Sequence, residues 1–234
     1  MKKKAMISTV ASILLAGTAC VGFAACNDTA ESIKSAVVSK ETWDAAFDEA
    51  IFEDFKVELE TVETTRTEQF VYAEKTTVTA QIKGGLQYIE TVRSDTLDGE
   101  VPEAQKEYYP VGEESYEYYV DYTNRVIIAE RDGDWVSVTP NQETAKRYVT
   151  VQYLLGIFLE DVDFERYEYN DGLKGYAVKD AEEGNAVVYK FKNGKLRAVC
   201  AKVTDKSDKA EITTVYSVLF TFGGQEVTLP AVSE

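Results

Sequence analysis

The stretch from Thr139 to Leu159 is the feature that most constrains how this chain can fold. Thr139 is suited to cap a helix and Pro140 to occupy its first position, so the pattern predicts a helix start here. Apolar residues, including Leu155 and Phe158, then recur at helical spacing. The sequence before and after is mostly typical of β-strands. One apolar helix between two β-rich halves predicts an α+β fold, in which a curved antiparallel sheet packs against helices.

A second helix is predicted near the start of the folded region. Ser39 can cap it, and an apolar stripe with helical spacing then runs from Trp43 through Phe47 to Ile51. A single clean stripe is typical of a helix that buries one face. We therefore expect Trp43 to be the main anchor of this helix in the core.

Short segments rich in β-branched and aromatic residues, separated by turn residues, predict a meander of antiparallel strands. Residues 94–105 are polar and contain a glycine and a proline, so we expect a loop there. The expected strands are 55–60, 70–75, 76–83, 86–92, 116–122, 125–130, 135–138, 164–169, 175–179, 186–191, 196–203 and 212–222. Several of them are apolar on both faces, so either both faces are covered in places or a curved sheet encloses an apolar space under the helices.

Residues 1–25 have the organisation of an export signal. Lys2, Lys3 and Lys4 form a positive start, and an apolar run without charge follows from Ala5 to Ala19. This run is too short to span a membrane comfortably. We therefore divide the chain into a signal peptide (1–25), a polar tether (26–38) and a single domain (39–234).

The end of this signal resembles the lipobox of bacterial lipoproteins. Phe23-Ala24-Ala25 precedes Cys26, as a bulky apolar residue and two small ones precede the cysteine of a lipobox, although Phe23 stands where leucine is usual. The resemblance implies cleavage after Ala25, lipidation of Cys26 and a position on the extracytoplasmic side of the cell membrane. Cys20 is the rival cysteine, but no bulky residue precedes it at the matching position. An ordinary secretory signal is the alternative interpretation.

The net charge argues against two classes of partner. The chain carries −16, and removing the three lysines of the signal changes this to −19. Nucleic acids and anionic lipid surfaces both require clustered basic residues. We therefore expect no nucleic-acid partner and attribute the charge to solubility.

The residue types exclude several kinds of catalysis. The chain has no histidine, so it cannot form a Ser-His-Asp triad or a histidine-rich metal site. Cys200 lies in a strand-like context, and we expect a small buried hydrophobic residue there rather than a thiolate nucleophile. The 41 acidic residues are too many for sequence to select a catalytic pair. We expect a protein that is not an enzyme and that requires no cofactor.

Tyrosines are concentrated between Tyr108 and Tyr122. Alternation predicts Tyr116, Tyr118 and Tyr122 on one strand face, with Tyr119 on the other. Tyrosines of a half-buried strand pack their rings and keep their hydroxyls wet. An aromatic surface for a sugar, a peptide or a lipid head group is the functional alternative.

The order of these elements resembles the LolA/LprG-like lipoprotein superfamily. The similarity consists of the lipobox, the short helix with Trp43 and Phe47, the repeated hairpins, the central helix and the ending from Phe222-Gly223 to Leu229-Pro230. It implies a strongly bent antiparallel sheet, or half-barrel, with two main helices on its concave face. Many members hold a lipid or acyl chains between the sheet and the helices.

We therefore expect a monomeric, membrane-anchored protein that binds a lipid or another hydrophobic molecule. The expected lining of the site comes from both helices and from the C-terminal strands: Trp43, Phe47, Leu155, Phe158, Tyr189, Tyr216 and Phe220. The same residues can simply fill a core. The alternative function is a surface module without a cavity that binds a protein or a glycan.

The lipobox gives a direct prediction. Changing Cys26 to Ser should release the protein from the membrane fraction, because the acyl anchor would be lost. Fractionation and immunoblotting would measure this, with Cys20→Ser as the matched control that stays membrane-bound. Release by Cys20→Ser alone would identify Cys20 as the lipidated residue.

Overall fold

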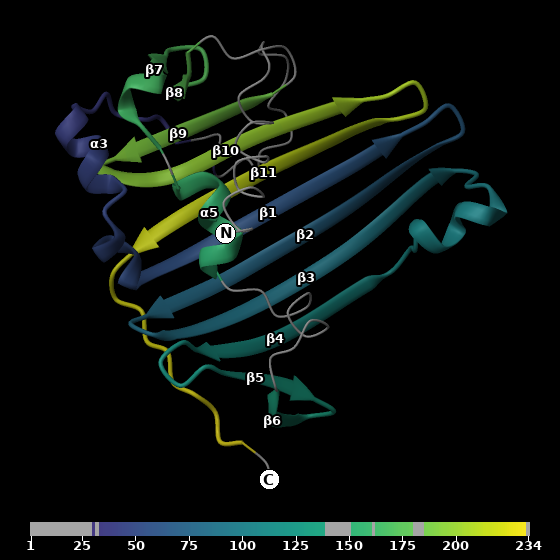
Figure 1. The fold of residues 1–234 in the computed structure, drawn as a ribbon, viewed down its shortest axis with the longest axis horizontal. Coiled ribbons are helices and arrows are strands. Elements are labelled where there is room, and N and C mark those ends of the chain that lie inside the picture. The colour runs from purple at the N-terminus through teal and green to yellow at the C-terminus, as the bar shows by residue number, and fades with distance from the viewer. Residues whose placement is uncertain (1–29, 31–32, 139–150, 161, 180–184, 233–234) are drawn as a thin grey trace, which may run out of the picture.

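The computed structural model describes residues 30, 33–138, 151–160, 162–179 and 185–232. In this part of the chain, an 11-stranded antiparallel sheet dominates the fold (Figure 1). The strands are β1 (Asp54–Arg66), β2 (Phe70–Lys83), β3 (Leu86–Gly99), β4 (Glu113–Asp121), β5 (Val126–Arg131), β6 (Asp134–Val138), β7 (Tyr167–Asn170), β8 (Gly175–Val178), β9 (Ala186–Lys192), β10 (Lys195–Lys206) and β11 (Glu211–Phe222).

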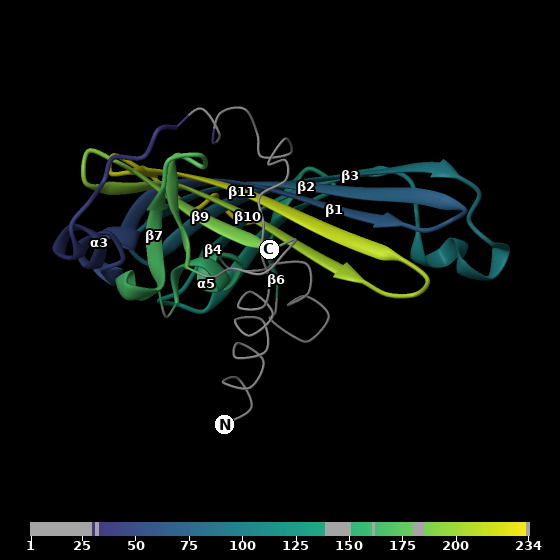
Figure 2. The ribbon, with the colours of Figure 1, turned by 90° about the horizontal axis from the view of Figure 1, so that it is seen from above.

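The sheet consists of two meanders joined at its centre. The strand order is β6-β5-β4-β3-β2-β1-β11-β10-β9-β8-β7, so the first and last strands pair with each other. Their register runs from Phe55 opposite Phe222 to Arg66 opposite Glu211. β6 and β7 form two separate edges, so the sheet is open and twisted (Figures 1 and 2). The predicted antiparallel meander is confirmed.

Short helices connect and cover the strands. They are α3 (Lys40–Ala46), η1 (Glu49–Glu53), η2 (Glu103–Tyr108), α5 (Val151–Leu159) and η3 (Phe164–Arg166), where η denotes a 3₁₀ helix. The predicted cap at Ser39 is confirmed, because its side chain accepts a hydrogen bond from the Thr42 N–H. The predicted start of the central helix at Thr139 lies outside the described residues.

The first helix is shorter than predicted. α3 ends at Ala46, and a separate 3₁₀ helix contains Ile51. Asp48 separates the two, because its backbone is extended and its side chain accepts a hydrogen bond from the Ala50 N–H at 2.9 Å. This local cap begins a new turn, so the prediction of one continuous helix to Ile51 is wrong.

The prediction of a loop over residues 94–105 is also wrong in its first half. β3 continues to Gly99, paired with β2 along its whole length. The two segments predicted at 70–75 and 76–83 form one long strand, which gives the polar end of β3 a partner. Residues 164–166 form η3 instead of the start of a strand. In β3, pairing with β2 therefore overrode the polar composition of residues 94–99.

The two faces of the sheet differ. We call the face that bears Phe55, Val57 and Leu59 the inner face, and the opposite face the outer face. Inner-face side chains form the main buried cluster together with Trp43 of α3 and Leu155 of α5. This cluster is the core of the molecule.

A smaller cluster covers part of the outer face. Ala30 and Ile33 pack there against Ala198, Cys200 and Val215. The Ala36 N–H also donates a hydrogen bond to the Phe191 carbonyl at 2.9 Å. The described residues of the expected tether therefore contact the sheet rather than extend away from it. Cys200 is buried, as predicted.

None of the helices in the described ranges is long and apolar enough to cross a membrane.

Burial of α5 gives a stability prediction. Leu155 is buried in the core, whereas Tyr153 on the same helix is 71% exposed. Leu155→Ala should lower the free energy of unfolding by about 2–5 kcal/mol, because it removes buried methyl groups and leaves a cavity. Urea denaturation would measure the change, with Tyr153→Ala as the control. Equal stability of the two variants would show that this side of α5 does not pack in solution.

Candidate ligand-binding site

All seven residues expected to line a ligand site lie in or against the main core cluster. Trp43, Leu155, Phe158, Tyr189 and Phe220 are buried, and Phe47 and Tyr216 are partly buried. Residues far apart in the sequence are thus brought together. The cluster has two parts, one around Trp43 and one beneath α5.

Trp43 is surrounded by aromatic rings. Six of them have centroids 5.1–5.6 Å from its own. The indole N–H donates a hydrogen bond to the Val162 carbonyl at 3.2 Å, so its polar atom is satisfied as well. The six rings are those of Phe47, Phe164, Tyr167, Tyr176, Tyr189 and Phe191. This part of the cluster is a closely packed core in which Trp43 is the anchor that the sequence predicted.

Tyr189 joins the two parts of the cluster. Its ring lies 5.6 Å from that of Trp43, and its hydroxyl donates a hydrogen bond to the Phe158 carbonyl at 2.9 Å. Burial raises the pKa of the Tyr189 hydroxyl well above its ordinary value, and the neighbouring Tyr167 raises it further. The hydroxyl therefore stays protonated and holds the end of α5 over β9.

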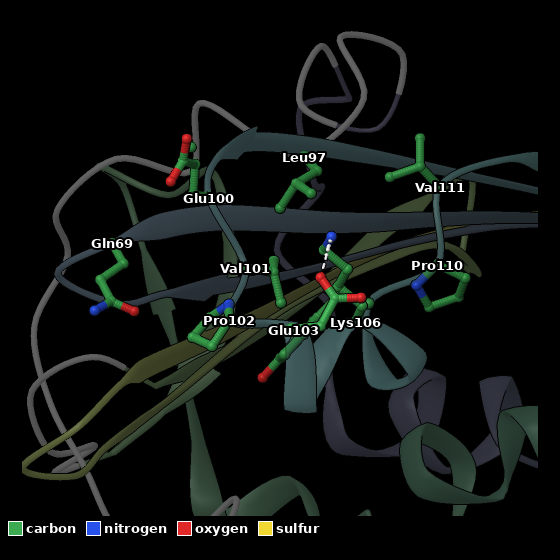
Figure 3. Close-up of a pocket in the computed structure, with 11 residues that line it drawn as sticks. Gln69, Leu97, Glu100, Val101, Pro102, Glu103, Lys106, Pro110 and Val111 are labelled. Atoms are coloured by element: carbon green, nitrogen blue, oxygen red, sulfur yellow. Dashed lines mark ion pairs between the residues drawn. The ribbon is translucent and has the colours of Figure 1, made fainter.

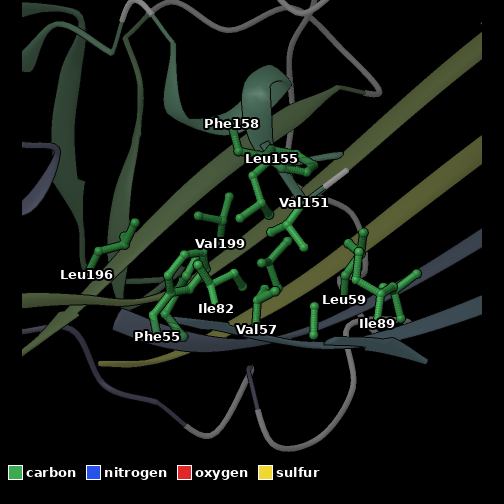
Figure 4. Close-up of a cluster of buried hydrophobic side chains, with 14 of the residues drawn as sticks. Phe55, Val57, Leu59, Ile82, Ile89, Val151, Leu155, Phe158, Leu196 and Val199 are labelled. Atoms are coloured by element: carbon green, nitrogen blue, oxygen red, sulfur yellow. The ribbon is translucent and has the colours of Figure 1, made fainter. Parts of the chain in front are cut away.

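α5 covers the apolar centre of the inner face. Val151, Leu155 and Phe158 belong to one buried cluster with side chains of the sheet, among them Val57 of β1 and Val199 of β10 (Figure 4). The N–H of Val151 donates to the Gln87 side-chain oxygen at 3.2 Å, and Gln87 is completely buried. Sequence reasoning missed Gln87, because a lone glutamine in a strand gives no sign of what it will contact.

The half-buried Tyr216 marks the border of this apolar region. Its ring lies 5.3 Å from that of Phe158. Beyond it the inner face becomes polar: Arg93 forms ion pairs with Glu74 at 2.8 Å and with Asp95 at 3.3 Å. Burial is the main cause of the raised pKa of the Glu74 carboxyl, and Arg93 opposes it. The sequence did not reveal this network, because Asp95 fell in the segment expected to be a loop.

An open groove lies at the far end of the sheet, between β3, η2 and the segment that leads to β4 (Figure 3). Its volume is about 1180 Å³. Leu97, Val101 and Val111 supply apolar surface, while Glu103 and Lys106 form an ion pair on its rim. The sequence did not predict this groove, because it depends on where β3 ends.

A row of aromatic rings lies on the outer face. The rings of Tyr88 and Tyr119 have centroids 5.1 Å apart, and Trp135 lies 5.1 Å from Tyr119. Tyr119 was correctly predicted to lie opposite Tyr116 and Tyr118, which are stacked on the inner face. The expected alternation fails at Tyr122, because β4 ends at Asp121 and Tyr122 follows in a turn.

Within the described ranges, no group of three or more histidine, cysteine, aspartate or glutamate side chains is arranged to hold a metal ion.

Comparison with known proteins gives little guidance. No protein-family model matches the chain, and no curated protein matches it. Among solved structures, a DUF1329 family protein from Desulfovibrio piger is similar over 78% of this chain and 90% of its own, with 10% identity and a TM-score of 0.21. A likeness at this level carries no argument about fold or function.

The position of Tyr189 predicts a pH effect. Tyr189→Phe should lower the free energy of unfolding by about 1–2 kcal/mol at pH 7, because the buried Phe158 carbonyl loses its donor. The folded pKa lies above the unfolded value of about 10, so this stabilisation is complete below that pH and is lost as the pH rises further. Guanidinium denaturation between pH 8 and about pH 11 should therefore give a smaller loss for the variant than for the wild type. Tyr108→Phe, at an exposed position, is the control; parallel pH curves for wild type and Tyr189→Phe would contradict the assignment.

Proposed function

We propose that this chain is a lipid-anchored protein of the extracytoplasmic side of the cell membrane, without enzymatic activity, that binds a lipid or another hydrophobic molecule between its sheet and its helices. In this proposal the sheet is a half-barrel of the LolA/LprG kind. The inner face is its concave face, and α3 and α5 lie on it.

One observation carries the proposal. The seven aromatic and aliphatic residues expected to line a site come from α3 and its C-cap, from α5, and from the two strands β9 and β11, and all of them belong to one apolar region. Tyr216 and Phe47 are only partly buried within it. An apolar region covered by a short helix and partly exposed at its margin suits a ligand held by burial of apolar surface.

The packing narrows the proposed site to the part beneath α5. Trp43 has aromatic rings on all sides and is a fixed wall rather than a flexible surface. Leu155 and Phe158 lie on a helix whose opposite side is exposed, at Tyr153 and Ile157. A movement of α5 would open the apolar surface between Phe158 and Tyr216. We place the acyl chain of a ligand there.

The anchor fits the way in which the N-terminal segment meets the sheet. Four positions separate Cys26 from Ala30, and an extended chain of this length spans at most about 14 Å. Ala30 is buried against Ala198 and Cys200 on the outer face. An anchor at Cys26 would therefore hold the outer face of β10 and β11 close to the membrane and leave the inner face and α5 turned away from it.

A second function is favoured by the outer face. Tyr88, Tyr119 and Trp135 form a row of partly exposed rings there. Such a row suits a protein or glycan surface and requires no cavity. In this alternative the residues beneath α5 are only a core.

Uptake of a fluorescent fatty acid by the purified soluble domain separates the two functions. The wild type should bind the probe, and native mass spectrometry of protein purified from membranes should detect a bound lipid. Leu155→Ala should bind the probe at least as well, because it enlarges the space, whereas Leu155→Trp should fill the space and bind it about tenfold more weakly.

Tyr153→Trp is the matched control, since it places the same ring on the exposed side of α5. Thermal unfolding of each variant would exclude a loss of binding through unfolding. If the folded wild type takes up no apolar probe and carries no lipid, the surface-module function replaces this proposal.

A further inference from the structure

β3 extends beyond β4, the strand that pairs with one of its two edges. β4 pairs with β3 only as far as Ser94 opposite Glu113, and the Asp95 N–H then donates to the Gly112 carbonyl at 2.9 Å. β2, in contrast, pairs with β3 as far as Gly99. In the described part of the chain, no strand lies beside the last residues of β3 on the β4 side.

The direction of the backbone groups follows from this ladder. Successive residues of an antiparallel strand direct their N–H and C=O groups alternately to the two sides. The Asp95 N–H points toward β4, so the N–H and C=O of Leu97 point to the same, open side. Thr96 and Asp98 direct theirs toward β2. Leu97 thus offers one donor and one acceptor to an added strand without disturbing the existing pairing.

Gly99 limits the length of this open edge. It has a φ of +95°, and a Cβ at this position would lie 2.3 Å from the Gln69 carbonyl oxygen. Only glycine tolerates this turn, after which the Glu100 N–H donates to the Gln69 carbonyl. The open edge is therefore a short stretch centred on Leu97, which suits a peptide segment better than a long strand.

The open groove lies next to this edge. Leu97 and Val111 are 36% and 62% exposed, and both line it. Its wall is anchored: Val101 and Tyr109 pack with Phe70 and Tyr72, and the Tyr109 ring lies 4.8 Å from that of Phe70. An apolar groove beside an open edge has the two parts of β-strand addition, in which backbone hydrogen bonds give affinity and a pocket accepts a side chain. The volume of about 1180 Å³ exceeds the roughly 300–1,000 Å³ of typical small-molecule sites.

Charge selects the kind of peptide. Six carboxylates lie between positions 98 and 114, against a single basic residue, Lys106. Lys106 forms an ion pair with Glu103 at 2.6 Å, so it does not offset the others. The acidic residues are all exposed: Asp98, Glu100, Glu103, Glu107, Glu113 and Glu114. A second copy of this chain would bring like charges together at such an edge, whereas a basic segment would be attracted to it.

We propose that an extended, basic segment of a partner protein binds here, adding a strand to β3 beside Leu97 and placing one apolar side chain in the groove. This binding surface lies at the opposite end of the inner face from α5, so it is independent of the proposed hydrophobic ligand. It gives the protein a second binding activity.

A short peptide of alternating lysine and valine is a suitable probe. Calorimetry should detect its binding to the wild-type domain, and added salt should weaken the binding because exposed charges contribute to it. The same peptide with N-methyl groups on alternate residues keeps its charge but loses donors along one side. It should bind at least about tenfold more weakly, since the backbone hydrogen bonds would be lost.

Leu97→Pro should weaken binding of the unmodified peptide to a similar extent, because it removes the N–H that points to the open side. Leu97→Val keeps this N–H and is the matched control. Circular dichroism would show that both variants fold; the N-methylated peptide tests the proposal even if the proline variant does not. Equal affinity of the two peptides for the wild type would mean that charge alone attracts them and would overturn the proposal. A dimer of the wild-type domain in sedimentation analysis that excludes the peptide would also overturn it.

Discussion

The pairing of β1 with β11 is the interaction on which the rest of the fold depends. It joins strands that are far apart in sequence over twelve residue pairs, from Phe55–Phe222 to Arg66–Glu211. Each half of the chain can form hairpins with its sequence neighbours, but only this contact makes one sheet of the two meanders. The pairing also places Val57 beside Phe220 on the inner face, so the core takes side chains from both halves. Because it closes a long loop, its entropic cost has to be offset by the apolar surface that it buries.

Helical cover explains why the inner face is divided. Where α3 and α5 supply Trp43, Leu155 and Phe158, the strands present apolar residues and bury them. Past Tyr216 the same strands continue, and Arg93, Glu74 and Asp95 form a charged network on their inner side. The β2–β3 ladder continues without interruption across this change, since strand pairing depends on the backbone. A long sheet with a short core thus leaves its far end open, and both the groove and the free edge of β3 lie there.

The sequence was informative wherever the decisive chemistry is local. The dipeptide Asn193-Gly194 is typical of a hairpin turn, and both residues have the positive φ that such a turn needs, at 54° and 72°. The Ser39 cap and the burial of Cys200 were found in the same way. The misses are non-local: β3 extends because β2 is there to pair with it, and Gln87 became buried because α5 reaches it. The seven expected site residues were brought together because each belongs to an apolar pattern; pattern alone does not separate a packed core from a ligand site.

The region beneath α5 is packed with side chains. A ligand can therefore bind there only if the free energy gained by burying its own surface offsets the free energy of the α5 contacts that it displaces. In the described residues, two hydrogen bonds link the backbone of α5 to strand side chains: Val151 N–H to Gln87, and Tyr189 hydroxyl to the Phe158 carbonyl. Each contributes about 0.5–1.5 kcal/mol net. Burial of an acyl chain gains about 0.8 kcal/mol for each CH₂, so about four such groups offset both bonds. The apolar contacts of Leu155 and Phe158 would be exchanged for contacts with the ligand rather than lost. Burial of a long acyl chain therefore gains enough free energy to displace α5, whereas a small polar molecule buries too little apolar surface to do so.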